Sequence, residues 1–185
     1  MPGLATVEIR RAAVEFARRG WPVRPGTYPA ECGTTWLGRL GAGRLEPLAE
    51  YACPAAFIDP TQALDIWATE PYSILIECGG LFDAVEVSAR HGRRALSVLR
   101  GTRSLGPVVR TPLGRWQFLI RPNRPLRPEL AAATDIMRLT AGSWLALPPT
   151  CHDCAPVRWC TTPEAVGWRL PRAGDVQKVL LSTMV

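Results

Sequence analysis

The stretch from Ala84 to Gly92, which reads Ala-Val-Glu-Val-Ser-Ala-Arg-His-Gly, decides the fold of this chain. It lies at the end of a run from Phe82 to Val87 in which β-branched and apolar residues predict a strand. From about Ala89 to Arg100 the pattern changes to that of a helix. The stretch therefore predicts a strand that leads directly into a helix.

Further strands are predicted on both sides of this one. A buried strand precedes it across Gly79-Gly80, and two strands joined through Pro112-Leu113-Gly114 follow the helix. Two more are predicted near the C-terminus, the first closed by Pro148-Pro149. The predicted strands are Ser73 to Cys78, Pro107 to Thr111, Trp116 to Arg121, Ser143 to Leu147 and Val157 to Cys160.

Helical patterns occupy most of the remaining chain. The first helix runs from Thr6, its expected N-cap, to Arg19, and the second opens at Asp59-Pro60 and stops before Pro71. A short helix is expected from 126 to 134 and a C-terminal helix over 172–185, while 26–58 is an irregular loop or insertion. This order indicates an α+β fold, a single domain over 1–185 whose central, mostly antiparallel sheet is flanked by helices.

Composition agrees with a folded domain and leaves the partner open. The 185 residues are 47% hydrophobic and 21% charged, as in globular proteins. The 22 basic and 16 acidic residues give a net charge of +6, which favours a polyanion such as nucleic acid, although a GC-rich genome also enriches arginine. Residues 1–20 hold no signal-peptide core and no run is long enough to span a membrane, so we expect a cytoplasmic protein without a membrane partner.

Several landmarks occur in the order of a known family. The run from Ala12 to Val23 resembles the opening helix and strand of the bifunctional DNA primase/polymerase N-terminal domain, the Prim-Pol fold of the archaeo-eukaryotic primase superfamily. The helix from Asp59-Pro60 to Trp67 resembles the family's next helix. The run from Ala84 to Gly92 is similar to the motif in which two acidic residues alternate along a strand before an Arg-His-Gly turn. The resemblance implies the Prim-Pol fold over roughly residues 7–170.

The chain departs from the family at its catalytic motifs. Glu86 matches the first acidic position, but Ser88 occupies the second and carries no charge for a divalent metal. In the family's Thr-Pro-Ser-Gly-Gly-x-His motif, Leu113 replaces the Ser, Arg115 the second Gly and Gln117 the phosphate-contacting His. Asp135, followed by Arg138, is similar to the family's Asp-x-Arg motif with the Asp shifted by one residue.

The resemblance makes Glu86, Asp135 and Gln117 vestigial catalytic positions. Magnesium or manganese would be bound only if the domain were active, because such ions need two or three carboxylates. Asp83 is offset by three residues from Glu86 and should point to the opposite face of the strand. Retained polymerase activity, a vestigial nucleotide or single-ion site, and a purely structural Glu86 are the alternatives, and the last is favoured.

Basic side chains near the motif strands are candidates for phosphate contacts. Trp116, Phe118 and Ile120 alternate as a buried face, so Gln117 is expected to be exposed in a groove on the other face. The arginines near this strand form either a phosphate-binding edge or, as we prefer, a solvated rim. That group comprises Arg115, Arg121, Arg124 and Arg127, and the candidate phosphate ligands are Arg115, Arg121, Arg138 and His91.

Six cysteines offer a second kind of chemistry. Cys151 and Cys154 have the spacing of a tetrahedral zinc site, and Cys160 follows closely. The fourth ligand would come from His152, Cys32 or Cys53, the last two lying where some family members carry a cysteine-rich insertion. The simpler alternative, which we prefer, is buried thiols without a metal.

The preferred function is a catalytically degenerate Prim-Pol-like domain that binds nucleic acid, either DNA or RNA, or a protein partner. An active metal-dependent DNA primase/polymerase is the first alternative. A ribosome-associated or scaffold protein with a structural zinc is the second. Magnesium-dependent nucleotide incorporation separates the first from the others, and salt-sensitive binding identifies a nucleic-acid module.

Overall fold

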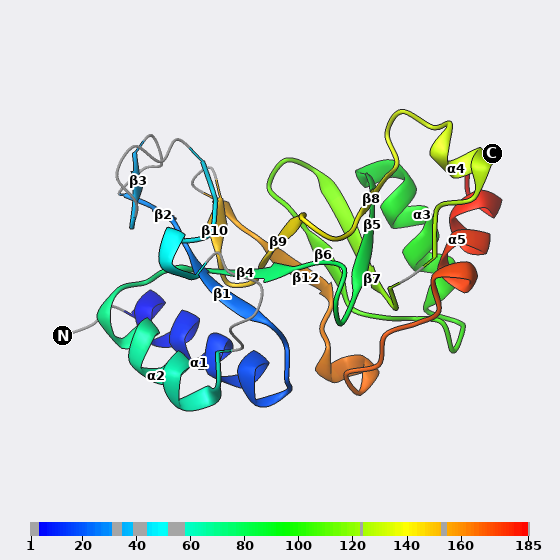
Figure 1. Cartoon of the computed structure of the whole chain (residues 1–185). Coiled ribbons are helices and arrows are strands. Elements are labelled where there is room, and N and C mark those ends of the chain that lie inside the picture. The colour runs from blue at the N-terminus through cyan, green and yellow to red at the C-terminus, as the bar shows by residue number, and fades with distance from the viewer. Residues whose placement is uncertain are drawn as a thin grey trace. The chain divides into compact units, whose positions relative to one another are not determined.

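The computed structural model describes residues 4–30, 35–38, 44–51, 58–122, 124–152 and 155–184 (Figure 1). Contacts divide the chain into two compact units. The first unit comprises Met1–Glu77 and Trp144–Arg158, and the second comprises Cys78–Ser143 and Trp159–Val185. Each unit is built from helices and antiparallel strands, which confirms the α+β class.

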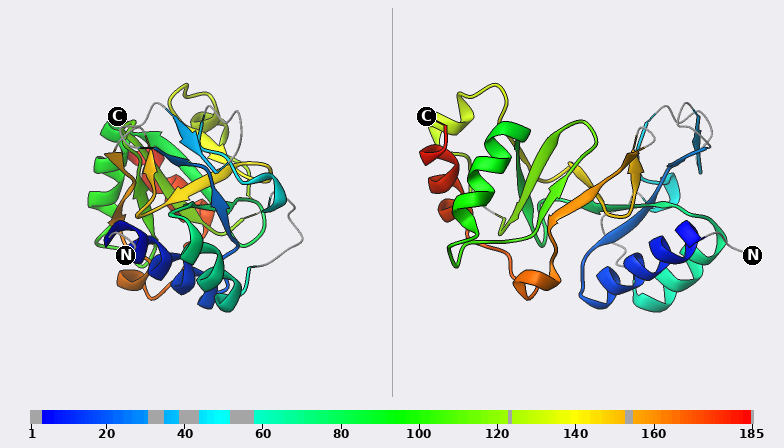
Figure 2. Two further views of the ribbon diagram at one scale, coloured as in Figure 1. Left: turned by 90° about the vertical axis from the view of Figure 1, so that its left-hand side faces the viewer. Right: turned by 180° about the vertical axis from the view of Figure 1, so that it is seen from behind.

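The first unit packs two helices with a three-stranded sheet. Helices α1 (Leu4–Arg18) and α2 (Pro60–Thr69) lie side by side (Figure 2). Strand β4 (Ser73–Glu77) is the middle strand, and it pairs antiparallel with β1 (Val23–Gly26) and β9 (Trp144–Leu147). The central position of β4 explains the apolar run from Ile74 to Ile76 within it, since both faces of the strand are buried there.

The start of α2 follows from its sequence. The Asp59 carboxylate accepts hydrogen bonds from the backbone N–H groups of Thr61 and Gln62 at 2.7 and 2.9 Å, and the Gln62 side chain accepts the Asp59 N–H at 3.0 Å. This reciprocal capping box confirms the predicted helix start. The predicted N-cap at Thr6 is wrong, because α1 already begins at Leu4.

Two small hairpins complete the described part of the first unit. Strand β2 (Tyr28–Pro29) pairs with β3 (Trp36–Leu37), and β10 (Cys151–His152) pairs with β11 (Ala155–Pro156). Strand β10 contacts β2, and the rings of Trp36 and His152 have their centroids 5.9 Å apart. The stretch 26–58, expected to be irregular, thus holds short strands and the 3₁₀ turn η1 (Ala49–Tyr51) among its described residues.

The second unit is built on a five-stranded sheet. Its strand order is β12-β6-β7-β5-β8, and the pairs β5–β7, β5–β8 and β6–β7 are antiparallel. The strands are β5 (Asp83–Ser88), β6 (Val108–Arg110), β7 (Arg115–Ile120), β8 (Met137–Leu139) and β12 (Arg158–Thr161). The strand that was predicted to lead directly into a helix is β5, which is followed at once by α3 (Ala89–Leu99).

Helices cover one face of this sheet. Helix α3 and the C-terminal helix α5 (Ala173–Ser182) pack on the face that carries Trp116, Phe118 and Ile120, so this alternation is the buried face, as predicted. A Cβ atom on Gly92 would lie 2.5 Å from the Trp116 side chain, so the glycine allows α3 to pack closely against β7. The first turn of α3 is thereby fixed next to the end of β5.

The remaining elements are short. The helix expected over 126–134 is the single turn α4 (Pro128–Ala131), and a 3₁₀ turn η2 (Glu164–Val166) lies before α5. Strand β8 was not predicted, because three residues are too few to show a period. No helix in the described ranges is long and apolar enough to cross a membrane.

Candidate functional site

Strands β5 and β7 bring Glu86 and Gln117 together. The two residues are direct partners in the antiparallel register, and Gln117 Nε2 donates a hydrogen bond of 2.8 Å to Glu86 Oε2. They lie on the sheet face opposite to Val85 and Phe118, which belong to the helix-covered core. Glu86 and Gln117 therefore share one face of two neighbouring strands.

The environment of Gln117 differs from the prediction. Its relative exposure is 6%, whereas the sequence predicted an exposed side chain. The expectation was wrong because β7 has neighbours on both sides, with Val109 of β6 opposite Gln117 on one side and Glu86 on the other. The Gln117 amide is therefore a buried partner of Glu86.

Arg115 completes the surroundings of Glu86. Its Nε donates to Glu86 Oε1 at 2.9 Å, and its Nη2 donates to the backbone oxygen of Asp135 at 2.8 Å. With Gln117 on Oε2, both oxygens of the Glu86 carboxylate accept a hydrogen bond. The Glu86 and Arg115 side chains are only 13% and 28% exposed, so solvent screens this ion pair incompletely.

A second acid–base pair lies beside the first. His91, in the first turn of α3, places Nδ1 at 2.9 Å from Asp135 Oδ2 and 3.3 Å from the hydroxyl of Ser88. Burial acts to raise the pKa of Asp135, but hydrogen bonding from Ser88 and the charge and hydrogen bond of His91 outweigh it, so this pKa lies below its ordinary value. Asp135 is therefore a carboxylate at neutral pH.

These contacts connect six side chains of the second unit into one group, which we call the Glu86 cluster. Arg115 connects the hydrogen bonds around Glu86 with those around Asp135, because it donates to the Glu86 carboxylate and to the Asp135 backbone oxygen. Four of the positions predicted from the family resemblance as catalytic or phosphate-binding residues thus come together with Arg115. The members are Glu86, Ser88, His91, Arg115, Gln117 and Asp135.

Arg138, another predicted phosphate ligand, lies elsewhere. It is opposite Val85 in the β5–β8 register, and its Nε donates to Asp83 Oδ2 at 3.1 Å. Asp83 is fully buried and points to the face opposite to Glu86, as predicted. The Arg138 guanidinium therefore balances a buried carboxylate on the helix-covered side of the sheet.

Arg121 is also separate from the Glu86 cluster. It follows the last residue of β7, and its Nε donates to the backbone oxygen of Leu170 at 3.0 Å. It lines a pocket with Arg124 and Arg127. Of the four arginines that the sequence placed near this strand, only Arg115 faces Glu86.

The Glu86 cluster does not fit the divalent ions that primase chemistry uses. Magnesium requires several oxygen ligands, usually including carboxylates, in a nearly octahedral arrangement. Ser88 stands where the resemblance places the second carboxylate, both Glu86 oxygens already accept hydrogen bonds, and the Arg115 cation lies 2.9 Å away. An incoming ion at Glu86 would have to displace the Arg115 guanidinium, and the other carboxylate of the cluster, Asp135, is already paired with His91.

The predicted zinc ligands are only partly described. Cys151 is exposed on β10 in the first unit, and Cys160 is half-buried on β12 in the second. Cys154, Cys32 and Cys53 lie outside the described residues. Within the ranges that are described, no three His, Cys, Asp or Glu side chains are arranged to hold a metal ion.

The ionisation of Cys160 bears on its proposed ligand role. Burial raises the pKa of the Cys160 thiol, and Arg110 and Arg100 only partly offset that effect. A metal ligand must be a thiolate, so zinc would have to overcome this preference for the protonated thiol. The zinc set stays a prediction.

Sequence reasoning missed two features of this unit. It did not pair Arg115 with Glu86, although residues 115 and 117 differ by two and must share a face of one strand. It also did not connect Arg121, Arg124 and Arg127 with Arg172 and Lys178, which line the same pocket. The second connection joins residues about fifty positions apart and has no local sequence signal.

A comparison with family models gives one match. The family described as bifunctional DNA primase/polymerase, N-terminal (Prim-Pol) matches residues 13–173, a range that includes every member of the Glu86 cluster. A comparison with curated proteins finds no significant match. The match covers most of the chain, and the strand-to-helix stretch that carries Glu86 and His91 lies within it. This chain therefore belongs to the bifunctional DNA primase/polymerase N-terminal family.

Proposed function

We propose that this chain is a catalytically degenerate Prim-Pol domain that binds nucleic acid without extending it. Membership of the family supports a nucleic-acid-related role. The observation that carries the proposal is the ion pair between Arg115 and Glu86, with Nε and Oε1 2.9 Å apart. A fixed side-chain cation stands beside the carboxylate that would otherwise attract a divalent ion.

The electrostatics of the cluster favour this proposal. Two-metal phosphoryl transfer needs a concentrated negative charge that holds both ions and orients the triphosphate. Here the guanidinium of Arg115 neutralises Glu86, and Ser88 adds no charge. The remaining carboxylate, Asp135, has His91 at 2.9 Å. Each carboxylate of the cluster therefore already has a basic partner.

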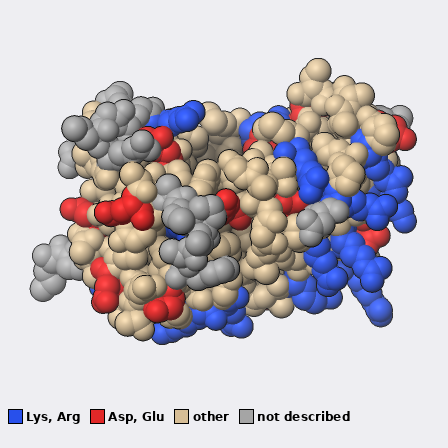
Figure 3. Space-filling view, viewed as in Figure 1, with Lys and Arg blue, Asp and Glu red and all other residues tan. Residues whose placement is uncertain are grey.

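Binding to nucleic acid is supported by charge rather than by the cluster itself. The chain has a net charge of +6, and Lys and Arg side chains gather most densely over the second unit on the face shown in Figure 3. Such a surface attracts phosphate backbones through counterion release, which is independent of base sequence. DNA or RNA is therefore the proposed partner.

One observation favours the active alternative. Glu86 and Asp135 both contact Arg115, so two acidic family positions lie in one cluster instead of at separate places. An active enzyme would require Arg115 to move away and the two carboxylates to meet at one ion. The experiment below distinguishes the two functions.

The test combines binding and extension on the same purified chain. Anisotropy of a labelled single-stranded oligonucleotide should rise on addition of protein and fall as salt increases. A primed template incubated with nucleotides and magnesium or manganese should show no longer product. Glu86→Gln is the matched control for any product that does form. Extension lost in Glu86→Gln would refute the proposal, and absence of salt-sensitive binding would refute its nucleic-acid half.

A further inference from the structure

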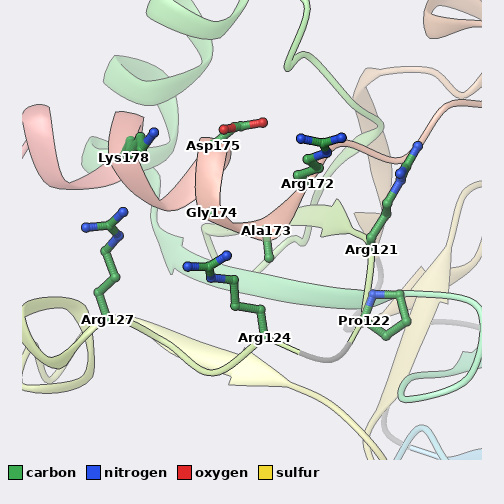
Figure 4. Close-up of a pocket in the computed structure, with 9 residues that line it drawn as sticks. All are labelled: Arg121, Pro122, Arg124, Arg127, Arg172, Ala173, Gly174, Asp175 and Lys178. Atoms are coloured by element: carbon green, nitrogen blue, oxygen red, sulfur yellow. The ribbon is translucent and has the colours of Figure 1, made fainter.

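We propose that the second unit has a dedicated phosphate-binding pocket between the segment after β7 and the start of α5. The pocket has a volume of about 440 Å³, within the range of small-molecule sites. Of the described side chains that line it, five are cationic and one is acidic. The cations are Arg121, Arg124, Arg127, Arg172 and Lys178, and the acid is Asp175 (Figure 4).

Two parts of the chain form the walls of this pocket. Figure 4 shows Arg124 and Arg127 rising from the segment before α4 toward α5, which carries Asp175 and Lys178. Arg172 immediately precedes α5. Cations from positions about fifty residues apart in the sequence therefore converge on one cavity.

The walls are fixed to each other by buried polar contacts. Gln177 of α5 is 1% exposed, and its side-chain oxygen accepts the Arg127 N–H at 2.8 Å while its amide nitrogen donates to the Pro125 oxygen at 3.0 Å. The Arg121 N–H donates to the backbone oxygen of Pro171 at 2.9 Å. The pocket is thus held in shape before any ligand arrives, which lowers the entropic cost of binding.

The charge of the pocket is not balanced internally. Among the described residues, no ion pair within 4.0 Å joins any of the five cations to an acidic group. A Cβ atom added to Gly174 would lie 3.5 Å from Cζ of the Arg124 guanidinium, so this group stands over the first turn of α5. The positive end of that helix adds to the same field.

Phosphate is the ligand chemistry that these groups recognise. Guanidinium groups bind phosphate oxygens through paired hydrogen bonds, and several of them around one cavity suit a ligand with several phosphates. Among the described residues that line the pocket, none has an aromatic ring on which a base could stack. The ligand is therefore recognised through its phosphates, supplied either by the backbone of a single strand or by a free polyphosphate.

The pocket is distinct from the Glu86 cluster. Helix α5 packs on the sheet face of Phe118 and Ile120, opposite to the face of Glu86 and Gln117. Arg121 lies beyond one end of β7, and Arg115 lies at the other end. The inference names the site at which the proposed nucleic-acid binding would occur, but phosphate binding there does not depend on whether the Glu86 cluster is catalytic.

The test removes two exposed pocket cations and compares a matched control. The pocket variant is Arg124→Gln with Lys178→Gln, and the control is Arg93→Gln with Arg103→Gln, two exposed arginines that do not line the pocket. Both variants lose two charges. Binding of inorganic tripolyphosphate is measured by calorimetry and binding of a labelled single-stranded oligonucleotide by anisotropy. Circular dichroism verifies that both variants are folded.

The pocket variant should bind tripolyphosphate about tenfold more weakly than the natural chain, or worse, while the control changes by less than about threefold. If the oligonucleotide uses the pocket, tripolyphosphate displaces it. The plot of log affinity against log salt concentration is then less steep for the pocket variant, by about 1.4 in slope, because two phosphate contacts are lost. If the oligonucleotide is not displaced, a free polyphosphate is the ligand. Failure of the natural chain to bind tripolyphosphate, or equal losses in the two variants, would overturn the pocket. Neither result bears on extension, which tests the catalytic half of the proposed function.

Discussion

Replacement of Arg115 by Met tests whether the guanidinium is a structural partner of Glu86. Arg115→Met keeps much of the side-chain volume but removes two hydrogen bonds, one to the Glu86 carboxylate and one to the Asp135 backbone. It leaves the Glu86 carboxylate, 13% exposed, with Gln117 as its remaining side-chain donor. We therefore expect a clear loss of stability.

The magnitude follows from the burial of the pair. A hydrogen bond to a charged group contributes about 1.5–3 kcal/mol, and removing one partner of a fully buried pair costs about 3–5 kcal/mol. Arg115 retains 28% exposure, so solvent compensates part of the loss and we expect about 2 kcal/mol. For a chain of this length, that loss lowers Tm by about 4–8 °C.

A double-mutant cycle separates the ion pair from general effects. Glu86→Gln in the Arg115→Met background removes the uncompensated carboxylate, so the double variant should be more stable than the sum of the single losses predicts, by about 1–2 kcal/mol. Arg103→Met is the control, because Arg103 is exposed and should change stability by less than about 0.5 kcal/mol. Thermal unfolding followed by circular dichroism compares five proteins, which are the natural chain, Arg115→Met, Glu86→Gln, the double variant and Arg103→Met. Equal melting of Arg115→Met and Arg103→Met would refute the structural role of Arg115.

Two further predictions concern titration and metal. Ser88 and His91 lower the pKa of the Asp135 carboxyl in the folded chain. The ionised carboxylate therefore stabilises the fold at pH values above its ordinary pKa of 3.8, and this contribution is lost as the pH falls through the lowered pKa of the folded state. The difference in urea midpoint between the natural chain and Asp135→Asn should therefore shrink between about pH 7 and about pH 3, and a constant difference would contradict this origin. If zinc is bound by Cys151, Cys154 and Cys160, protein purified without added zinc should hold about one ion per chain, and Cys154→Ser should lose it and melt lower. A folded protein without zinc would refute this ligand set.

Much of the second unit could be predicted because its elements have clear periods. The alternation from Trp116 to Ile120 identified the buried face of β7, and the same periodicity placed Asp83 on the face opposite to Glu86. The capping residues at Asp59 likewise fixed the start of α2. These features depend on local sequence, which a single chain reveals.

The remainder depends on contacts between distant residues. The burial of Gln117 follows from its having neighbours on both sides, which the sequence of β7 alone does not contain. The partner of Arg115 required the register between β5 and β7. The grouping of Arg124 with Lys178 required the packing of α5 against the segment before α4, which Gln177 fixes through its side-chain hydrogen bonds.

Primer extension by the natural chain, measured in magnesium and in manganese, tests most directly whether the Glu86 cluster is inactive. The assay uses a labelled primer on a template, all four nucleotides and a known active polymerase as the positive control. Because Arg115 neutralises Glu86 and Ser88 supplies no second carboxylate, we predict no product above that of the reaction without protein. Extension by the natural chain that disappears in Glu86→Gln would contradict the account.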